Sequence, residues 1–410
     1  MSVNNDPPIP LLTKNQFAKA ILDRIVQGGE AWPLDYDPKG FCLVTGGAPI
    51  YNLGNAYQEF EMAEPTGRAK NIRHYVRAWF SRHQTIPQDF ADAAPDLLPK
   101  IVHRFSMEIG HLQSKIRNAT PNADWNQVFG EHFAHCLVYD LPTTAVEIDL
   151  PGLAAWKVTP EEAYQVALKN LANRSRKTFE LVAPGVLMGT WQDGYDSSRL
   201  LLLDVIRRPR VKGDPVIMVP NPGSLLLTGS NDPKGLSNLA KSGNELFNRF
   251  RPLSGIALRL HGNEWVPYLP DRRHPAFDTL DLLRLKTSAE AYKYQQQLLE
   301  TLYRQRDEDK VVATVSFLGH PKTKRPFTYC LWQHHFFDAY LPRTDTVFFT
   351  LRIPFSQEDY AAMCSWDHVV NICGDLMEPQ GMYPELYRVR QFPSETQLAK
   401  LKQADIRASF

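Results

Sequence analysis

The stretch from Thr159 to Gly243, called the central stretch below, constrains the fold more than any other part of this sequence. Its pattern predicts helix, strand pair, helix, strand pair and helix, with a polar junction before each later helix. Thr159 should cap the first helix, because Pro160 takes the first helical position and Glu162 completes a capping box. Gly243 should end the last helix, as a glycine often does.

Two hairpins are predicted inside the central stretch. FELVAPGVLMGTW should turn on Pro-Gly, and PVIMVPNPGSLLLTGS should turn at 221–223. A helix start follows each hairpin. Asp196 or Ser197 is expected to cap the first of these helices, and Asn231 or Asp232 the second.

Short hairpins that alternate with helices predict an α+β fold, with mixed, largely antiparallel sheets packed against helices. A doubly wound parallel sheet is the second choice, because strict strand–helix–strand alternation is missing. A length of 410 residues favours two or three units. The predicted map has a flexible tail at 1–12, an N-terminal unit at 13–150, a central unit at 151–270 and a C-terminal extension at 271–410.

Outside the central stretch the patterns are simpler. Thr13 and Gln16 form a capping box for a first helix that should stop at Gly28. LLPKIVHRFSMEI, at 97–109, predicts a strand. A long helix is expected at about 288–306, and the tail from 356 to 410 is expected to form helices with irregular connections.

Composition limits the partners and the compartment. The formal net charge of +1 provides no field for nucleic acid, and no apolar run reaches the roughly 18 residues of a membrane span. The start, MSVNNDPPIPLL, lacks the pattern of a signal peptide. Five scattered cysteines are typical of reduced thiols, so a cytoplasmic location with no membrane and no nucleic-acid partner is expected.

Several segments resemble the YtpQ-like family of uncharacterised bacterial proteins. In the central stretch these are VTPEEAYQVALKNL, DGYDSSRLLL and VPNPGSLLLTGSNDPKGLSNL; before it they are YNLGNAYQEF, DLLPKIVHRF and HFAHCLVYDLP. The resemblance covers about 12–269, and LWQHHFFDAYLPRTDTVFF with the helix before it looks like a C-terminal extension of some members. It implies a cytoplasmic bacterial protein of α+β type, and it implies no reaction, cofactor or catalytic residue.

The junction from Asp193 to Arg199 is the first candidate site. Backbone N–H groups at a helix start suit an anion, and Asp and Ser side chains could bind a cation or act as base and nucleophile. Turn and cap chemistry is the preferred explanation of most of these residues, because no His or Lys at a fixed spacing supports a nucleophile. Arg199 is the exception, because an arginine at a helix start opposes the helix dipole. It is expected either to pair with Asp193 or Asp196 or to await an anionic ligand.

The junction from Thr228 to Asp232 is the second candidate. It is not a phosphate loop, because the GxxxxGK[ST] spacing is missing. If the two hairpins share one sheet, both helix starts could lie at the same edge and form a polar crevice. The predicted ligand-binding residues are Asp193, Asp196, Ser197, Arg199, Ser230 and Asp232.

The histidine and cysteine clusters predict no metal site. His132 and His135, near Glu131 and Cys136, should point to opposite faces of a strand. His334–His335 should alternate in a strand likewise, and Cys364, His368 and Cys373 match no zinc spacing in a segment expected to be helical. No cofactor is predicted.

The sequence therefore favours a non-catalytic interaction or ligand-binding protein, with a protein or a small anionic ligand as its partner. The alternative is a hydrolase or phosphotransfer enzyme that uses the Asp193–Arg199 and Thr228–Asp232 junctions. A concave pocket that joins the two junctions would favour the enzyme.

Overall fold

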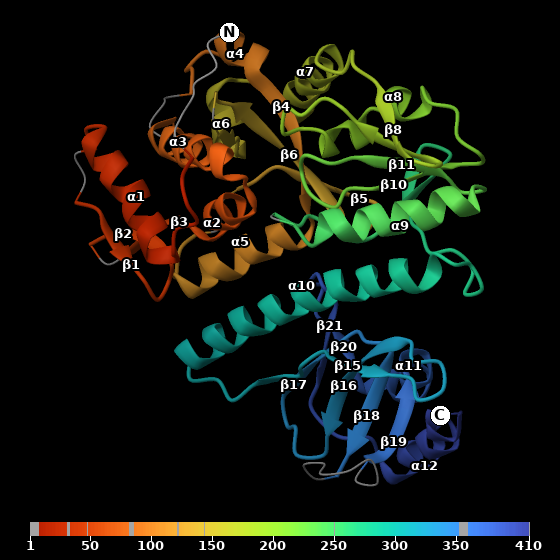
Figure 1. The fold of residues 1–410 in the computed structure, drawn as a ribbon. Coiled ribbons are helices and arrows are strands. Elements are labelled where there is room, and N and C mark those ends of the chain that lie inside the picture. Colours follow the sequence, from red (N-terminus) through yellow and green to blue (C-terminus); the bar gives the residue numbers. More distant parts are fainter. Residues whose placement is uncertain are drawn as a thin grey trace. The chain divides into compact units, whose positions relative to one another are not determined.

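The computed structural model describes residues 8–409 except 31–32, 47, 82–85, 121–122, 143, 250 and 352–359. Helices and mostly antiparallel sheets follow one another along the chain, which confirms the α+β class (Figure 1). Residues 1–7 of the predicted flexible tail lie outside the described residues.

The chain forms two compact units, and each is built from separate segments of the sequence. The first unit comprises residues 1–100, 136–177 and 247–252, and the second comprises 101–135, 178–246 and 253–410. The predicted map of consecutive units, with boundaries at 150 and 270, divides the chain elsewhere. As a description of independently folding parts it stays a prediction.

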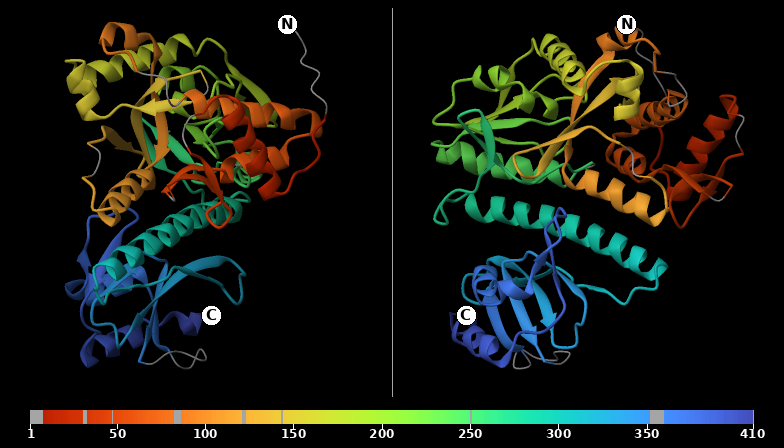
Figure 2. Two further views of the ribbon diagram at one scale, coloured as in Figure 1. Left: turned by 90° about the vertical axis from the view of Figure 1, so that its left-hand side faces the viewer. Right: turned by 180° about the vertical axis from the view of Figure 1, so that it is seen from behind.

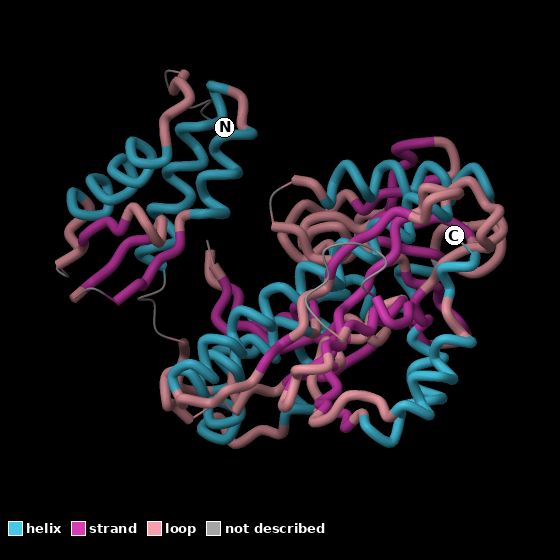
Figure 3. Tube along the Cα trace, turned by 90° about the horizontal axis from the view of Figure 1, so that it is seen from below, coloured by secondary structure: helices cyan, strands magenta, loops and turns pink. Residues whose placement is uncertain are grey.

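The first unit begins with three helices beside a small antiparallel sheet (Figure 3). Its elements are α1 (Lys14–Gln27), α2 (Gly54–Met62), α3 (Pro65–Ser81), β1 (Asp35–Asp37), β2 (Cys42–Thr45) and β3 (Ala48–Asn52). The capping box at Thr13 and the end of α1 at Gly28 are both confirmed. Phe17, Phe60 and Trp79 are fully buried between these elements and form the centre of their core.

A helical layer and part of a second sheet complete the first unit. Its elements are α4 (Phe90–Ala93), the 3-10 turn η1 (Ala94–Asp96), β4 (Leu97–His103), β6 (Phe133–Asp140), β7 (Ala145–Glu147), α6 (Leu150–Ala155) and α7 (Pro160–Asn173). The predicted capping box of α7 is confirmed, because Thr159 Oγ1 accepts from Glu162 N and the Glu162 carboxylate accepts from Thr159 N. The chain passes between the two units within β4 and β6.

The strand predicted at 97–109 is only half correct. β4 ends at His103, and α5 (Phe105–Ile116) follows directly. Met107, Glu108, Leu112 and Gln113 are good helix formers, and Phe105 and Leu112 are spaced two turns apart on the buried side of α5. The apolar run continues from the strand into the helix, so the sequence pattern did not show where β4 ends and α5 begins.

A six-stranded antiparallel sheet forms the centre of the second unit, in the order β13-β12-β10-β11-β9-β8. The strands are β8 (Phe179–Ala183), β9 (Val186–Gly189), β10 (Pro215–Met218), β11 (Leu226–Gly229), β12 (Leu258–His261) and β13 (Glu264–Pro267). Both predicted hairpins are confirmed, and both lie in this sheet. The 3-10 turn η2 (Ser197–Leu201), α8 (Leu203–Arg207) and α9 (Pro233–Phe247) follow the hairpins, and β5 (Asn126–Phe129) pairs with β6.

Gly243 does not end α9, so that prediction is wrong. The helix continues to Phe247, and Gly243 is buried in its interior. A Cβ atom at this position would lie 2.6 Å from Met218 Sδ in β10. The glycine therefore lies where α9 packs against the Met218 side chain and does not terminate the helix.

The second unit continues with a helix of 29 residues, α10 (Phe277–Gln305), which starts earlier than the predicted 288. Figure 1 shows α5 running alongside it. Although α10 is long, no helix in the described part of the chain is both long and apolar enough to span a membrane.

Two four-stranded sheets follow α10 (Figure 2). One has the order β15-β16-β18-β19, with β15 (Ser316–Gly319), β16 (Pro326–Gln333), β18 (Thr346–Thr350) and β19 (Tyr360–Ser365). The other has the order β14-β17-β21-β20, with β14 (Val311–Val312), β17 (Ala339–Pro342), β21 (Leu386–Val389) and β20 (Glu378–Pro379). The helical elements here are α11 (Trp366–Cys373), η4 (Gly374–Leu376), α12 (Glu395–Gln403) and η5 (Ile406–Ser409). The tail from 356 to 410, predicted to form helices with irregular connections, does contain α11 and α12, but the strands β19, β20 and β21 were missed. Residues 356–359 lie outside the described residues.

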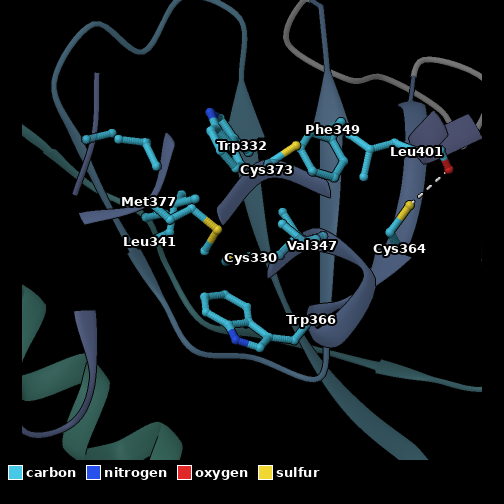
Figure 4. Packing of buried hydrophobic residues seen from close by; sticks show 14 of the residues in the cluster. Cys330, Trp332, Leu341, Val347, Phe349, Cys364, Trp366, Cys373, Met377 and Leu401 are labelled. Carbon is cyan, nitrogen blue, oxygen red and sulfur yellow. Dashed lines mark hydrogen bonds between the residues drawn. The ribbon is translucent and has the colours of Figure 1, made fainter. Parts of the chain in front are cut away.

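The core around these sheets contains three of the cysteines. Cys330, Cys364 and Cys373 pack with Trp332 and Phe349 (Figure 4), and the Cys364 thiol donates to the carbonyl of Leu401 at 3.2 Å. Burial raises the pKa of each of these three thiols to about 12. All five cysteines of the chain are buried free thiols, so they behave as small apolar side chains.

Candidate functional site

Arg199 lies in the interior of the second unit, not at a surface. Its side chain is 0% exposed. It donates to both oxygens of Asp193, at 2.9 and 2.7 Å, and its guanidinium lies 4.4 Å from the centre of the Trp191 ring. Burial would raise the pKa of Asp193, but the hydrogen bonds and charge of Arg199 outweigh it, and the pKa is lowered. The first junction therefore contains a buried ion pair.

Asp196 and Ser197 do not cap a helix, so that prediction is wrong. Asp196 has helical backbone angles, and its Oδ1 accepts from Gln192 N at 3.2 Å, which closes the preceding turn. Ser197 is itself the first residue of η2, and its N–H donates to the carbonyl of Pro222. Asp196 is fully buried, its Oδ2 has no hydrogen-bond partner among the described residues, and burial raises its pKa.

The second junction uses its polar groups in turn and cap contacts. Asp232 Oδ1 accepts from Gly235 N at 3.0 Å, which confirms the predicted cap of α9. Ser230 Oγ accepts from Asp214 N at 2.9 Å, and Ser230 N donates to the carbonyl of Asp214. These contacts hold the chain that enters α9.

The predicted crevice between the two junctions does not form. β9 and β11 are antiparallel neighbours, with Met188 opposite Leu226, so their carboxyl ends point to opposite ends of the sheet. The contacts agree with this. Ser197 bonds to the β10–β11 turn at Pro222, whereas Asn238 of α9 donates to the carbonyl of Pro184 in the β8–β9 turn. The sequence identified both junctions, but it did not show that the strands before them, β9 and β11, run in opposite directions.

The histidine and cysteine clusters are also dispersed. His334 and His335 follow the end of β16 instead of alternating within a strand, and Cys364 lies in β19, not in a helix. Among the residues that the structure describes, no three His, Cys, Asp or Glu side chains are placed to share a metal ion.

A cleft in the second unit, called the cleft below, gathers a different set of residues. Its volume is about 830 Å³. It is lined by the start of α5, the turn before β6, the middle of α10, the segment after β17, the start of α11 and the residues between β20 and β21. The charged and titratable residues along it are His103, Arg104, Glu131, His132, Arg272, Arg284, Arg343, Asp345, Asp367, Tyr383 and Glu385.

Four arginines and four carboxylates line the cleft, and only some of them pair with one another. Asp345 Oδ2 accepts from the N–H and the hydroxyl of Thr328, and Glu385 accepts from Arg343 at 3.2 Å. Arg104 and Arg272, in contrast, form no ion pair with a carboxylate among the described residues. Glu131 and Asp367 likewise form no ion pair with an arginine among the described residues, so the cleft has unpaired groups of both signs, and its two unpaired guanidinium groups can accept an anionic group.

A histidine and a tyrosine form a short contact in the cleft wall. The Tyr383 hydroxyl lies 2.6 Å from His132 Nδ1, and His132 Nε2 lies 3.9 Å from a carboxylate oxygen of Glu131. The Arg104 guanidinium lies over the Tyr383 ring, 4.5 Å from its centre. Burial lowers the pKa of His132 and raises that of Tyr383, so both groups are neutral near pH 7.

His103 also lines the cleft, next to this contact. Its Nδ1 accepts from Phe105 N at 3.2 Å, so its proton is on Nε2, which is buried without a hydrogen-bond partner among the described residues. Burial, together with the nearby His132, lowers the pKa of His103 to about 4. His103 thus stays neutral and adds no charge to the cleft.

No local sequence pattern identified the cleft. Its charged residues come singly from segments far apart in the chain, and the nearest signal was His132 in the histidine cluster at 131–136. Searches with this chain found no matching family model, no matching curated protein and no matching solved structure.

Proposed function

We propose that the protein binds a small organic anion in the cleft of its second unit. The observation that carries the proposal is the pair of arginines, Arg104 and Arg272, which line the cleft without a carboxylate partner among the described residues. Two further arginines, Arg284 and Arg343, line the same cleft beside their own carboxylates. Guanidinium groups recognise carboxylate, phosphate and sulfonate oxygens with two parallel hydrogen bonds.

The size and the floor of the cleft favour an organic ligand over a bare ion. A volume of about 830 Å³ falls in the range typical of sites for small molecules and cofactors. α10 contributes Leu285, Ser288 and Ala289, which offer apolar and small side chains between the charged groups. A ligand with an anionic group and an apolar body matches both features.

We propose binding without chemistry as the primary function. An enzyme that uses the two junctions of the central stretch would need them close together, and the antiparallel pairing of β9 and β11 gives that alternative no geometric support. Membership of the YtpQ-like family, which would make this a cytoplasmic bacterial protein, is also proposed on the resemblance alone. The five buried free thiols are compatible with that compartment.

The compartment can be tested through the thiols. Protein isolated from its native cell and denatured without reductant should show five reactive thiols, because no disulfide is expected to form in a reducing cytosol. Two or more thiols protected by disulfides would contradict the cytoplasmic assignment.

Binding is tested by isothermal titration calorimetry with sulfate, pyrophosphate, citrate and benzenedisulfonate, and with the cation spermidine for comparison. At least one anion should bind saturably, and spermidine should not. Arg272→Glu should weaken anion binding roughly tenfold or more, because a charge-assisted hydrogen bond contributes about 1.5–3 kcal/mol.

Arg306→Glu is the matched control, since Arg306 is exposed at the end of α10 and does not line the cleft. It makes the same change in net charge and should leave the affinity within about twofold. An equal loss in both variants, or no binding of any of the four anions, would overturn the proposal.

A further inference from the structure

The chain Glu131–His132–Tyr383 in the cleft wall suggests how an anion is recognised. The imidazole of His132 stands between a carboxylate, 3.9 Å from Nε2, and a phenol, 2.6 Å from Nδ1. Each ring nitrogen thus has one partner, and both partners, Glu131 and Tyr383, line the cleft. The arrangement can therefore transmit a change at the Tyr383 hydroxyl to the protonation state of His132.

One arrangement of protons fits both contacts of the neutral ring. A neutral His132 with its proton on Nε2 directs that proton towards Glu131. Nδ1 then has a lone pair, and the Tyr383 hydroxyl donates to it. In this arrangement Tyr383 has no proton left to offer a ligand.

An anion in the cleft changes this arrangement. It can accept a hydrogen bond from Tyr383 only if the hydroxyl turns its proton away from His132. The Tyr383 oxygen then faces Nδ1 with lone pairs, so the contact at 2.6 Å requires a proton on Nδ1. A neutral ring with its only proton on Nδ1 would turn the lone pair of Nε2 towards the Glu131 carboxylate, 3.9 Å away, so the imidazolium is the form that suits both neighbours.

We propose that Tyr383 is the hydrogen-bond donor to the anion and that His132 takes up one proton when the anion binds. The inference rests on the proposed function, since it concerns the same cleft. It makes Tyr383 a specificity-determining residue and His132 a positioning residue. The proton comes from the solvent, so the complex gains one positive charge together with the ligand's negative charge.

The surroundings hold Tyr383 in place for this role. Gln295 donates to the carbonyl of Pro384 at 3.0 Å, and the Tyr292 hydroxyl donates to the carbonyl of Glu385 at 3.0 Å. Both donors are on α10, so the residues next to Tyr383 are fixed to a long helix. Arg104 covers one face of the ring, which limits rotation of the phenol.

Charged and titratable groups of several elements act on His132. They are His103 at the end of β4, Arg104 at the start of α5, Glu131 in the same turn, Arg284 on α10, and Tyr383 before β21. Glu131 favours the imidazolium, while burial and the two arginines disfavour it. Before an anion binds, these effects together keep His132 neutral. The negative charge of a bound anion favours the imidazolium.

The direction of the pH effect follows from this balance. The anion raises the pKa of His132 in the complex above its value in the free protein. Affinity should therefore rise as the pH falls through the value in the complex, by up to about tenfold per pH unit. It should level off below the value in the free protein, where His132 is already protonated in both states.

The experiment uses the full chain and a probe whose charge does not change with pH, benzenedisulfonate or sulfate, whichever binds more tightly. Titrations at about pH 5.5, 6.5 and 7.5, in buffers of different ionisation enthalpy, report the protons taken up. Uptake should approach about one proton within this range. The wild-type protein alone gives this answer, so the test does not depend on a variant that folds.

Three variants assign the effect. His132→Gln and Tyr383→Phe should both abolish the uptake, and Tyr383→Phe should also weaken binding about tenfold at the lowest pH. His111→Gln is the matched control, since His111 is exposed on α5 and does not line the cleft, and it should keep full uptake. Thermal melts establish that each variant is folded.

Two results would overturn the inference and leave the proposed function standing. One is saturable binding with no proton uptake in the wild-type protein. The other is full uptake in folded Tyr383→Phe, which would remove the hydroxyl from the coupling. If neither probe bound at any of the three pH values while citrate or pyrophosphate did, an anion of fixed charge would not be recognised through Tyr383, and the inference would fail. If none of the four anions bound, both proposals would fail together.

Discussion

The buried ion pair of Arg199 and Asp193 explains the residue that cap chemistry could not. An arginine opposes the dipole of a helix start, and its presence there suggested an anionic ligand. Its guanidinium instead meets Asp193 and the face of Trp191, and these two partners precede it by six and eight positions. The Asp193 pairing was one of the sequence alternatives. The aromatic partner and the complete burial were not, because both depend on how the turn folds back.

Replacement of Arg199 should therefore be costly for folding. Arg199→Leu removes one member of a buried pair and leaves Asp193 without its counter-charge, which typically costs about 3–5 kcal/mol of unfolding free energy. Urea denaturation measures the loss. Arg208→Leu is the matched control, because the Arg208–Asp204 pair is exposed and should contribute at most about 1 kcal/mol. Similar losses in the two variants would refute the structural role of Arg199.

Asp196 should behave in the opposite way. Its folded pKa is raised by burial, so its ionisation opposes folding. The contribution of the protonated acid is present in full below the unfolded pKa and is lost as the pH rises through the folded value. Asp196→Asn keeps an oxygen for Gln192 N and cannot ionise. Its advantage in unfolding free energy over the wild type should therefore appear near pH 7 and shrink towards pH 4.

Denaturation of both proteins at these two pH values checks this expectation. A variant that is less stable than the wild type at pH 7, or an advantage that grows on acidification, would contradict it.

Among the elements, α9 shows what close packing on a sheet requires. Gly235 lies in its first turn, where a Cβ would collide with the hydroxyl of Thr228 and lie 2.8 Å from the carbonyl of Gly185. A backbone carbonyl within a β-hairpin cannot move far. Gly235→Ala should therefore cost about 1–3 kcal/mol, as overpacked sites do, even though alanine is the better helix former.

Gly243→Ala in the same helix is the comparison. Its Cβ would meet only the end of the Met218 side chain, which is flexible. We expect this variant to stay within about 1 kcal/mol of the wild type, because rearrangement of Met218 is offset by the higher helix propensity of alanine. Chemical denaturation of both variants measures the difference. Equal losses would show that the backbone contact at Gly235 is not the cause.

The elements themselves were predictable where the signal is local. The capping boxes at Thr13 and Thr159 and the hairpins of the central stretch depend on residues a few positions apart, and all are confirmed. The relation between β9 and β11 is not local. It decides on which side of the sheet each junction lies, and the sequence had no pattern that reports it.

At the scale of the whole molecule, the same limit applies to the cleft. Its wall joins His132 to Tyr383, which are 251 positions apart. Sequence patterns describe spacing within an element, and nothing in them brings such distant residues together. The sequence also led us to expect a small anionic ligand, as the proposed function does. That expectation was based on the two junctions of the central stretch and not on the residues of the cleft.

Limited proteolysis tests the map of the chain. Subtilisin, which has little sequence preference, should cut first in the tail before Leu12 or near the exposed Arg272. Mass spectrometry of the early fragments identifies the site. A first cut between 200 and 227, which contains the buried strand β10 and the start of β11, would be incompatible with the predicted order of cleavage.

α10 also sets the spacing of several residues that line the cleft. Arg284, Ser288 and Tyr292 succeed one another at four-residue steps, so the helix repeat sets about 6 Å between each. One residue inserted before Arg284 would turn these side chains by about 100° relative to the preceding part of the helix. Changes in the number of residues in α10 are therefore constrained by phase: a gain of seven residues restores the facing to within about 20°, and a gain of one does not.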